Sequence, residues 1–197
     1  MSANAVAFSQ TTQFRRLRRP AVSAAATVTA ISVLLGFWPL TGRWLTSMPE
    51  ALVPSAIGLP FAVPPLRLFP LGETTWMYWA VDVLAAFVMI GIVLLYLNSW
   101  ANRHPQSGRA RAFLAGVTAT VAGAVIGNVI RIVFLSFDSH HNLATYVVAV
   151  AATVLVTLIW GAILGILTGV VHAAIRPQQV RETEDAGSPP VADYESV

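Results

Sequence analysis

The stretch FLAGVTATVAGAVIGNVIRIVFLSF, residues 113–137, holds one charged side chain, Arg131, in a run of otherwise apolar and small residues. It is longer than the ~18 apolar residues that mark a candidate membrane span. Three more stretches of this kind lie at about residues 21–40, 76–100 and 146–175. Backbone polar groups in lipid must be hydrogen-bonded within their own segment or a closed barrel, and the alternation typical of barrel strands is not visible. The sequence therefore predicts an all-α integral membrane protein, a four-transmembrane-helix bundle over residues 20–176.

The composition agrees with a location in lipid. Of the 197 residues, 56% are hydrophobic and 11% are charged, whereas soluble domains carry about 25% charged residues. A water-soluble globule is thereby excluded. The chain has no cysteine, which excludes disulfides, thiolate metal sites and cysteine nucleophiles.

The arginines predict the orientation. All twelve basic residues are arginine, as is typical of a GC-rich genome, and basic residues in short loops stay on the cytoplasmic side of a membrane. Those next to the predicted cytoplasmic ends are Arg15, Arg16, Arg18, Arg19, Arg103, Arg109, Arg111, Arg176 and Arg181, and those outside are Arg43 and Arg67. We expect both termini inside, in the plasma membrane of a GC-rich bacterium, with the arginines contacting anionic lipid headgroups instead of nucleic acid.

Three segments flank or connect the spans. Residues 1–19 form a basic cytoplasmic arm, expected to be disordered at its tip, and Pro20 is expected to open the first helix. Residues 177–197 are charged and rich in proline, so a disordered cytoplasmic tail is predicted. Residues 41–75 form a proline-rich outer loop, in which each proline disfavours helix for the residue before it. This loop is expected either to lie at the outer interface or to fold as a cap over the bundle, where it would meet a substrate or partner.

Small residues recur every three or four positions in two of the predicted spans. Such stripes allow close helix packing, which drives association where lipid tails are as apolar as leucine. The stripes are Gly116, Thr120, Gly123 and Gly127 in the third span and Thr153, Thr157, Gly161, Gly165 and Gly169 in the fourth. They predict either packing of these two helices against each other or contact with a membrane protein partner or a second copy of the chain.

Two ionisable residues lie inside the spans, where a charge costs at least ~2.5 kcal/mol at mid-membrane. Asp82 and Arg131 each lie about six residues from the outer end of a helix, so at ~1.5 Å per residue both should be ~9 Å deep. Antiparallel neighbours would bring them together as a salt bridge, with Asn128 on the same face as Arg131. The cluster is expected to act as a structural clamp, or alternatively as a substrate path or proton relay, and an arginine reaching the interface is a third possibility.

Metal-capable side chains are sparse. Asp138, His140 and His141 lie close together in the short loop between the third and fourth spans. Adjacent histidines point in different directions on regular structure, and His104 and His172 are predicted on the opposite side of the membrane. The sequence therefore predicts no metal site and no cofactor, with these three residues as weak candidates only.

The segment Asn128-Val129-Ile130-Arg131-Ile132, followed by His140 or His141, resembles part of the membrane-embedded exosortase and archaeosortase transpeptidases. The resemblance covers about fifteen residues. In that family an N-x-x-R-I segment and a later histidine serve a cysteine nucleophile on an earlier helix, and here the corresponding region, residues 80–84, reads AVDVL. The resemblance thus implies a relative without the catalytic cysteine.

These observations favour a non-enzymatic accessory or assembly subunit that packs against other membrane components through its small-residue faces. A second interpretation is a transporter or channel element in which Asp82, Asn128 and Arg131 line a polar path. A degenerate exosortase-like protein is the third.

Overall fold

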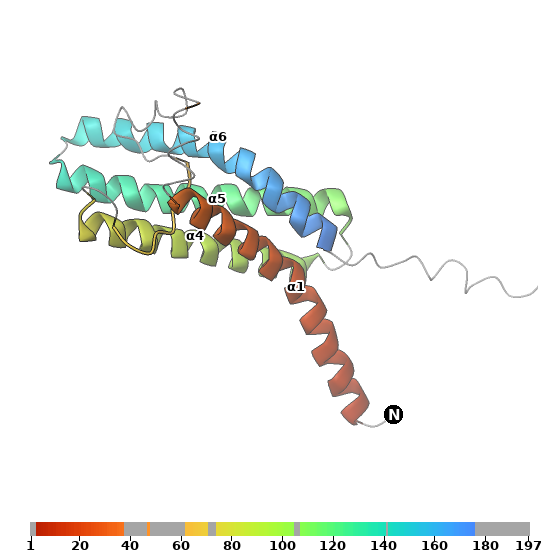
Figure 1. The fold of residues 1–197 in the computed structure, drawn as a ribbon. Coiled ribbons are helices and arrows are strands. Elements are labelled where there is room, and N and C mark those ends of the chain that lie inside the picture. Colours follow the sequence, from red (N-terminus) through yellow and green to blue (C-terminus); the bar gives the residue numbers. More distant parts are fainter. Residues whose placement is uncertain are drawn as a thin grey trace, which may run out of the picture.

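The structure, a computed structural model, describes residues 3–37, 47, 62–70, 74–104, 107–140 and 142–175, with side chains from Pro20 onward. Its long helices are α1 (Ala3–Gly36), α4 (Trp76–Arg103), α5 (Arg109–Asp138) and α6 (Leu143–Ile175). Figure 1 shows α4, α5 and α6 lying side by side, with α1 crossing them. The all-helical prediction is confirmed for this part of the chain.

Three of the four helices, α4, α5 and α6, are long and apolar enough to cross a membrane. The apolar part of α1 is the shorter stretch Pro20–Gly36, which at ~1.5 Å per residue covers about 26 Å, against ~30 Å for a hydrocarbon core. The first predicted span continues to residue 40, and its last three residues lie outside the described part. A membrane location therefore rests on three helices, and the fourth span stays a prediction.

The start of α1 differs from the prediction. The helix begins at Ala3 and carries Pro20 inside it, so the expectation that Pro20 opens the helix is wrong. Residues 3–19 include several alanines, glutamines and arginines, which are good helix formers and continue the helix toward the N-terminus. The predicted tail, residues 177–197, lies outside the described residues.

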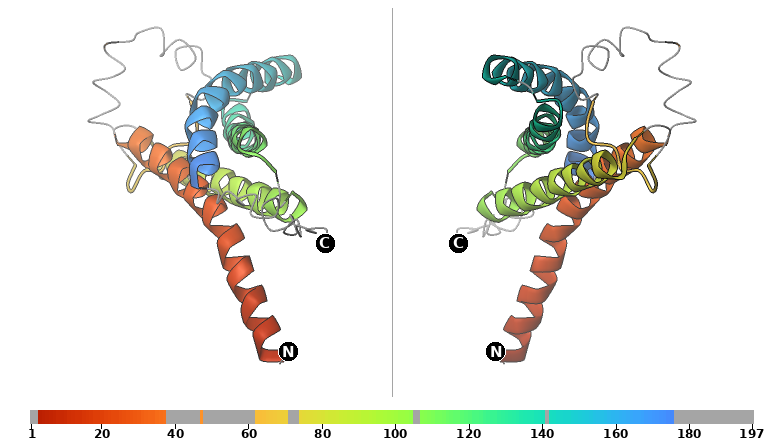
Figure 2. Two further views of the ribbon diagram at one scale, coloured as in Figure 1. Left: turned by 90° about the vertical axis from the view of Figure 1, so that its right-hand side faces the viewer. Right: turned by 90° about the vertical axis from the view of Figure 1, so that its left-hand side faces the viewer.

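Helix α5 is the central helix of the bundle. It contacts α4 on one side and α6 on the other, and α1 contacts both α4 and α6. The two views of Figure 2 show the same neighbours. Because short connections join α4 to α5 and α5 to α6, consecutive helices are antiparallel.

Residue size separates the inside of the bundle from its outside. Large apolar side chains such as Leu95, Ile159 and Ile163 are half or more exposed, as expected for helices whose outer faces meet lipid. Small side chains fill the contacts between helices. Those buried in α5 include Ala112, Ala115, Gly116, Ala119, Thr120, Gly123, Ala124 and Gly127.

Candidate functional site

The two ionisable residues within the helices form an ion pair. Arg131 Nε of α5 lies 2.6 Å from Asp82 Oδ1 of α4, and the two side chains are 15% and 16% exposed. The antiparallel packing of α4 and α5 places them at the same depth, which the sequence reasoning anticipated. Because removing one partner would leave a mostly buried charge unpaired, each depends strongly on the other.

Asn128 extends the ion pair into a network. Its Oδ1 accepts a hydrogen bond from Arg131 Nη1 at 2.9 Å. Its Nδ2 donates to the carbonyl of Ala62 at 2.7 Å and to Thr157 Oγ1 of α6 at 3.0 Å. Asn128 is fully buried, and a primary amide has two donor hydrogens and one acceptor oxygen. Both the donor nitrogen and the acceptor oxygen of this amide are therefore hydrogen-bonded within the protein.

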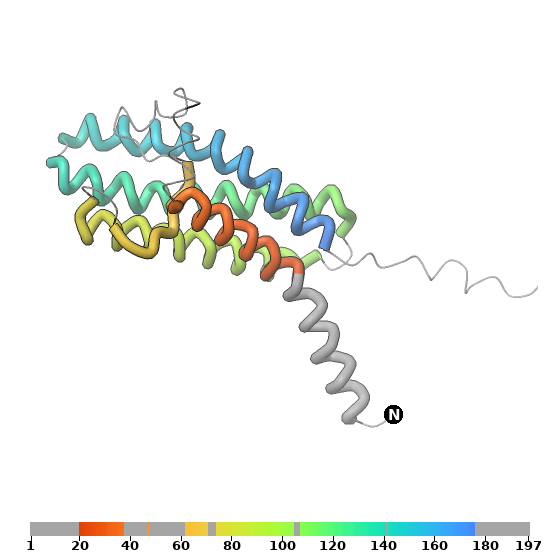
Figure 3. The backbone as a smooth tube through the Cα atoms, viewed as in Figure 1, coloured from red at the N-terminus to blue at the C-terminus, as the bar shows by residue number. Residues whose placement is uncertain are grey.

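The carbonyl bound by Asn128 belongs to a non-helical segment, residues 62–66, that enters the bundle. Ala62 and Val63 are 1% and 2% exposed. In Figure 3 the described part of this connection, residues 62–70, is coloured gold and runs next to the end of α1. The prediction placed the proline-rich loop at the outer interface or as a cap over the bundle, and residues 62–66 are the part of it that packs against the helices. Irregular backbone at this depth is tolerated only where protein surrounds it.

The backbone of this segment is satisfied by neighbouring helices. The amide of Leu66 donates to the carbonyl of Ser32 in α1 at 2.9 Å, and Trp79 Nε1 of α4 donates to the carbonyl of Arg67 at 2.8 Å. Pro64 and Pro65 have no N–H to satisfy. The Pro-Pro pair, which we used only as evidence against helix, is thus also suited to burial, and it is the signal in the sequence that marks this segment.

Glycines on one face of α5 make room for the segment and for α4. A Cβ on Gly127 would lie 2.8 Å from Pro64 Cγ and 3.0 Å from the carbonyl oxygen of Ala85, and one on Gly123 would lie 2.9 Å from the carbonyl oxygen of Met89. These distances are shorter than an ordinary van der Waals contact. Substitution would therefore push α4 or residues 62–66 away from α5.

The other face of α5 meets the stripe of α6. A Cβ on Gly116 would lie 2.6 Å from Gly169 Cα, and Cβ atoms on Gly161 and Gly165 would each lie 3.2 Å from the Cα of a valine of α5. The stripe residues of α6 are all buried; they are Thr153, Thr157, Gly161, Gly165 and Gly169. Gly116 and the glycines of α6 thus lie in the contact between α5 and α6, whereas Gly123 and Gly127 of the α5 stripe face α4 and Pro64. The two predicted stripes therefore meet only in part.

Two of the three weak metal candidates, Asp138 and His140, lie in the described residues. Asp138 Oδ2 accepts a hydrogen bond from the hydroxyl of Tyr78, which joins the start of α4 to the end of α5. His140 has a positive φ of 51° just after α5, and His141 lies outside the described residues. Within the described residues no group of three or more metal-capable side chains occurs.

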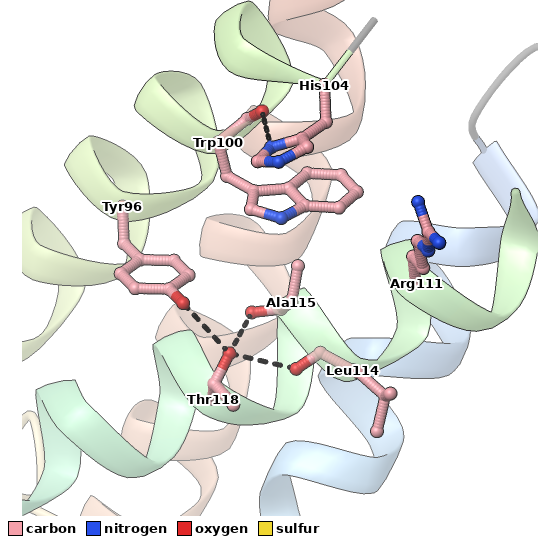
Figure 4. A pocket seen from close by; sticks show the side chains of 7 residues that line it. All are labelled: Tyr96, Trp100, His104, Arg111, Leu114, Ala115 and Thr118. Atoms are coloured by element: carbon pink, nitrogen blue, oxygen red, sulfur yellow. Dashed lines mark hydrogen bonds between the residues drawn. The ribbon is translucent and has the colours of Figure 1, made fainter. Parts of the chain in front are cut away.

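The opposite end of the bundle holds a pocket that sequence reasoning missed. A cavity of 360 Å³ opens between α4 and the first turns of α5. Figure 4 shows Tyr96, Trp100 and His104 on the α4 side, facing Arg111 and Thr118 of α5. No single sequence motif predicts this pocket, because its lining residues come from two helices on either side of a turn.

Buried polar contacts anchor that end. His172 of α6 is 1% exposed, and its Nδ1 lies 3.0 Å from the carbonyl oxygen of Pro20. The ring of Trp100 meets that of His172 edge on, with centroids 6.2 Å apart. The wall of the pocket is therefore tied to α1 and α6 as well as to α4.

Comparison with protein families, with curated proteins and with solved structures gives no match. The segment that resembles the exosortases has definite neighbours in the structure: Asn128 binds Ala62 and Thr157, and Arg131 binds Asp82. Asp82 lies in the region where the resemblance places a nucleophile. Since the chain has no cysteine, thiolate chemistry has no group to perform it.

Proposed function

We propose that this protein is a non-enzymatic, multi-pass membrane protein that serves as an accessory or assembly subunit of a larger membrane complex. The observation that carries this proposal is the use of its intramembrane polar groups. Arg131 binds both Asp82 and Asn128. Asn128 also binds Thr157 and the backbone carbonyl of Ala62. Because these polar groups already have partners within the protein, they support a structural role more than a catalytic one.

The partner surface in this proposal is the outward face of α6. The small-residue stripe on α6, for which packing on the neighbouring helix and contact with a partner were both predicted, is occupied by α5. What α6 offers beyond that contact is a ridge of large apolar side chains, among them Leu155, Ile159 and Ile163, which are 64%, 64% and 50% exposed. A helix of a partner membrane protein would pack along this ridge.

We also propose that the chain crosses the plasma membrane of a GC-rich bacterium four times, with both termini in the cytoplasm. The arginine distribution and the antiparallel order of α4, α5 and α6 support this orientation. Single cysteines at Ser107 and Asn142, introduced one at a time, give the test. We expect a membrane-impermeant thiol reagent added to intact cells to label the residue-142 variant and not the residue-107 variant, and the reverse pattern would overturn the orientation.

The assembly proposal is tested in native membranes of the host. We expect the tagged 21.1 kDa chain, extracted in mild detergent, to migrate in a complex with other membrane proteins at fixed stoichiometry. Replacement of Ile159 and Ile163 by tryptophan should dissociate the complex. The same change at Leu95, a 70% exposed residue of α4, is the matched control and should leave it intact. A chain that migrates alone in native extracts would contradict the proposal.

The second candidate is a transporter or channel element, and the partial exposure of Asp82 and Arg131 favours it. A polar path through these residues would require the carboxylate to exchange partners during transport. Purified protein in sealed vesicles would then move protons or a solute, and Asp82→Asn would abolish that flux. If the protein is an assembly subunit, we expect no flux with the parent protein or with Asp82→Asn.

A further inference from the structure

We propose that the pocket between α4 and α5 is a binding site for an anionic phospholipid, with the lipid phosphate at Arg111. This site lies at the opposite end of α4 and α5 from the Asp82–Arg131 pair and is independent of the assembly role. The charge, the shape and the depth of the pocket support this assignment.

The charge at the mouth of the pocket is positive. Arg111 lines it and is exposed. The sequence has no acidic residue between Asp82 and Asp138, so α4 after Asp82 and α5 before Asp138 bring no negative charge to this end. Guanidinium groups bind phosphate through paired N–H donors. A basic pocket between membrane helices is a known setting for lipid headgroups.

Beyond Arg111 the pocket is lined by aromatic, aliphatic and hydroxyl side chains. The rings of Trp100 and His104 stack with centroids 5.4 Å apart, and tryptophan rings favour the interface between headgroups and hydrocarbon. Further along, the hydroxyl groups of Tyr96 and Thr118 lie 3.3 Å apart. Leu114 and Ala115 supply the apolar part of the floor beside these hydroxyl groups. A ligand that fits has an anionic head and an apolar body.

The depth of the pocket matches a lipid that lies alongside the helices. Arg111 and Thr118 are seven residues apart on one helix, which corresponds to ~10 Å along its axis. Arg111 lies two residues after the start of α5 at Arg109, hence at the level of the headgroups if α5 crosses the membrane. The phosphate would lie at Arg111, the glycerol near Trp100, and the upper part of an acyl chain beside Leu114 and Thr118.

The test measures lipid retention by the purified full-length protein with native mass spectrometry. Phosphatidylglycerol and phosphatidylcholine are added separately, and inorganic phosphate is added as a competitor. We expect phosphatidylglycerol to be retained in preference to phosphatidylcholine. Arg111→Gln should lower its retention about five- to tenfold, as the loss of one charged contact implies.

Two control variants locate the site. Arg103→Gln removes the same charge from an exposed residue at the end of α4 that does not line the described pocket, and we expect phosphatidylglycerol retention to be nearly unchanged. Thr118→Phe keeps the charge and fills the floor, so retention should fall as it does for Arg111→Gln. Equal losses from Arg103→Gln and Arg111→Gln would overturn the site in favour of a diffuse basic surface. Equal retention of both lipids, or displacement of phosphatidylglycerol by inorganic phosphate, would overturn the proposal of an anionic lipid.

Discussion

Both faces of α5 use glycines for close approach, Gly123 and Gly127 toward α4 and residues 62–66 and Gly116 toward α6, but the two faces differ in the polar contacts that accompany the glycines. Toward α4 and residues 62–66, the contact depends on an ion pair and on an amide that binds backbone and side chain, with Arg131 and Asn128 as its centre. Toward the second half of α6, the contact is made by glycines that bring the two backbones together. The polar face holds an irregular segment that has no packing stripe of its own. The glycine face joins two regular helices, for which close approach is enough.

The largest effect is expected on the polar face. Asp82→Asn and Arg131→Gln each leave one member of the pair without its partner, so each should lower the free energy of unfolding by about 3 kcal/mol. The exchange Asp82→Arg with Arg131→Asp restores opposite charges and should recover part of the loss. Denaturation in mixed micelles measures these values. Two single variants as stable as the parent protein would show that the bridge does not hold α4 to α5.

On the glycine face the effect is smaller but still definite. Gly116→Ala introduces a Cβ at 2.6 Å from Gly169 Cα, and because a backbone atom cannot turn aside, we expect a loss of about 2 kcal/mol. Gly91→Ala is the matched control in α4, since a Cβ there meets nothing within 4 Å. It should leave stability unchanged or raise it by up to about 1 kcal/mol, because alanine favours helix. If both variants behave alike, close packing of α5 on α6 is not what stabilises this face.

The smallest effect compares two threonines of α6 that are four residues apart. Thr157 accepts a hydrogen bond from Asn128, whereas Thr153 is buried and its hydroxyl has no hydrogen-bond partner among the described residues. Thr157→Val should therefore cost about 1 kcal/mol, and Thr153→Val should be neutral or stabilising, since it removes an unsatisfied polar group. The same denaturation measurement separates them. A larger loss from Thr153→Val would contradict the hydrogen-bond assignment.

The features that could be predicted from the sequence follow from the length of the apolar runs and from the regular rise of a helix. Apolar runs identified the helices α4, α5 and α6, and equal depth along antiparallel helices was enough to pair Asp82 with Arg131. The position of residues 62–66 could not be predicted in this way, because irregular backbone has no period and its place depends on contacts with helices distant in sequence, among them α1 and α5. The same holds for the pocket at Arg111, whose lining residues share neither a motif nor a helix.

The central claim is that Asn128 and the Asp82–Arg131 pair hold residues 62–66 inside the bundle. Because the chain has no cysteine, a single cysteine at Val63 can be followed without background. We predict that a membrane-impermeant thiol reagent labels Val63→Cys slowly and labels Leu68→Cys, at an 87% exposed position, rapidly. Adding Asn128→Ala should raise the rate at position 63 toward that at position 68. Rapid labelling of Val63→Cys with Asn128 intact would contradict the claim.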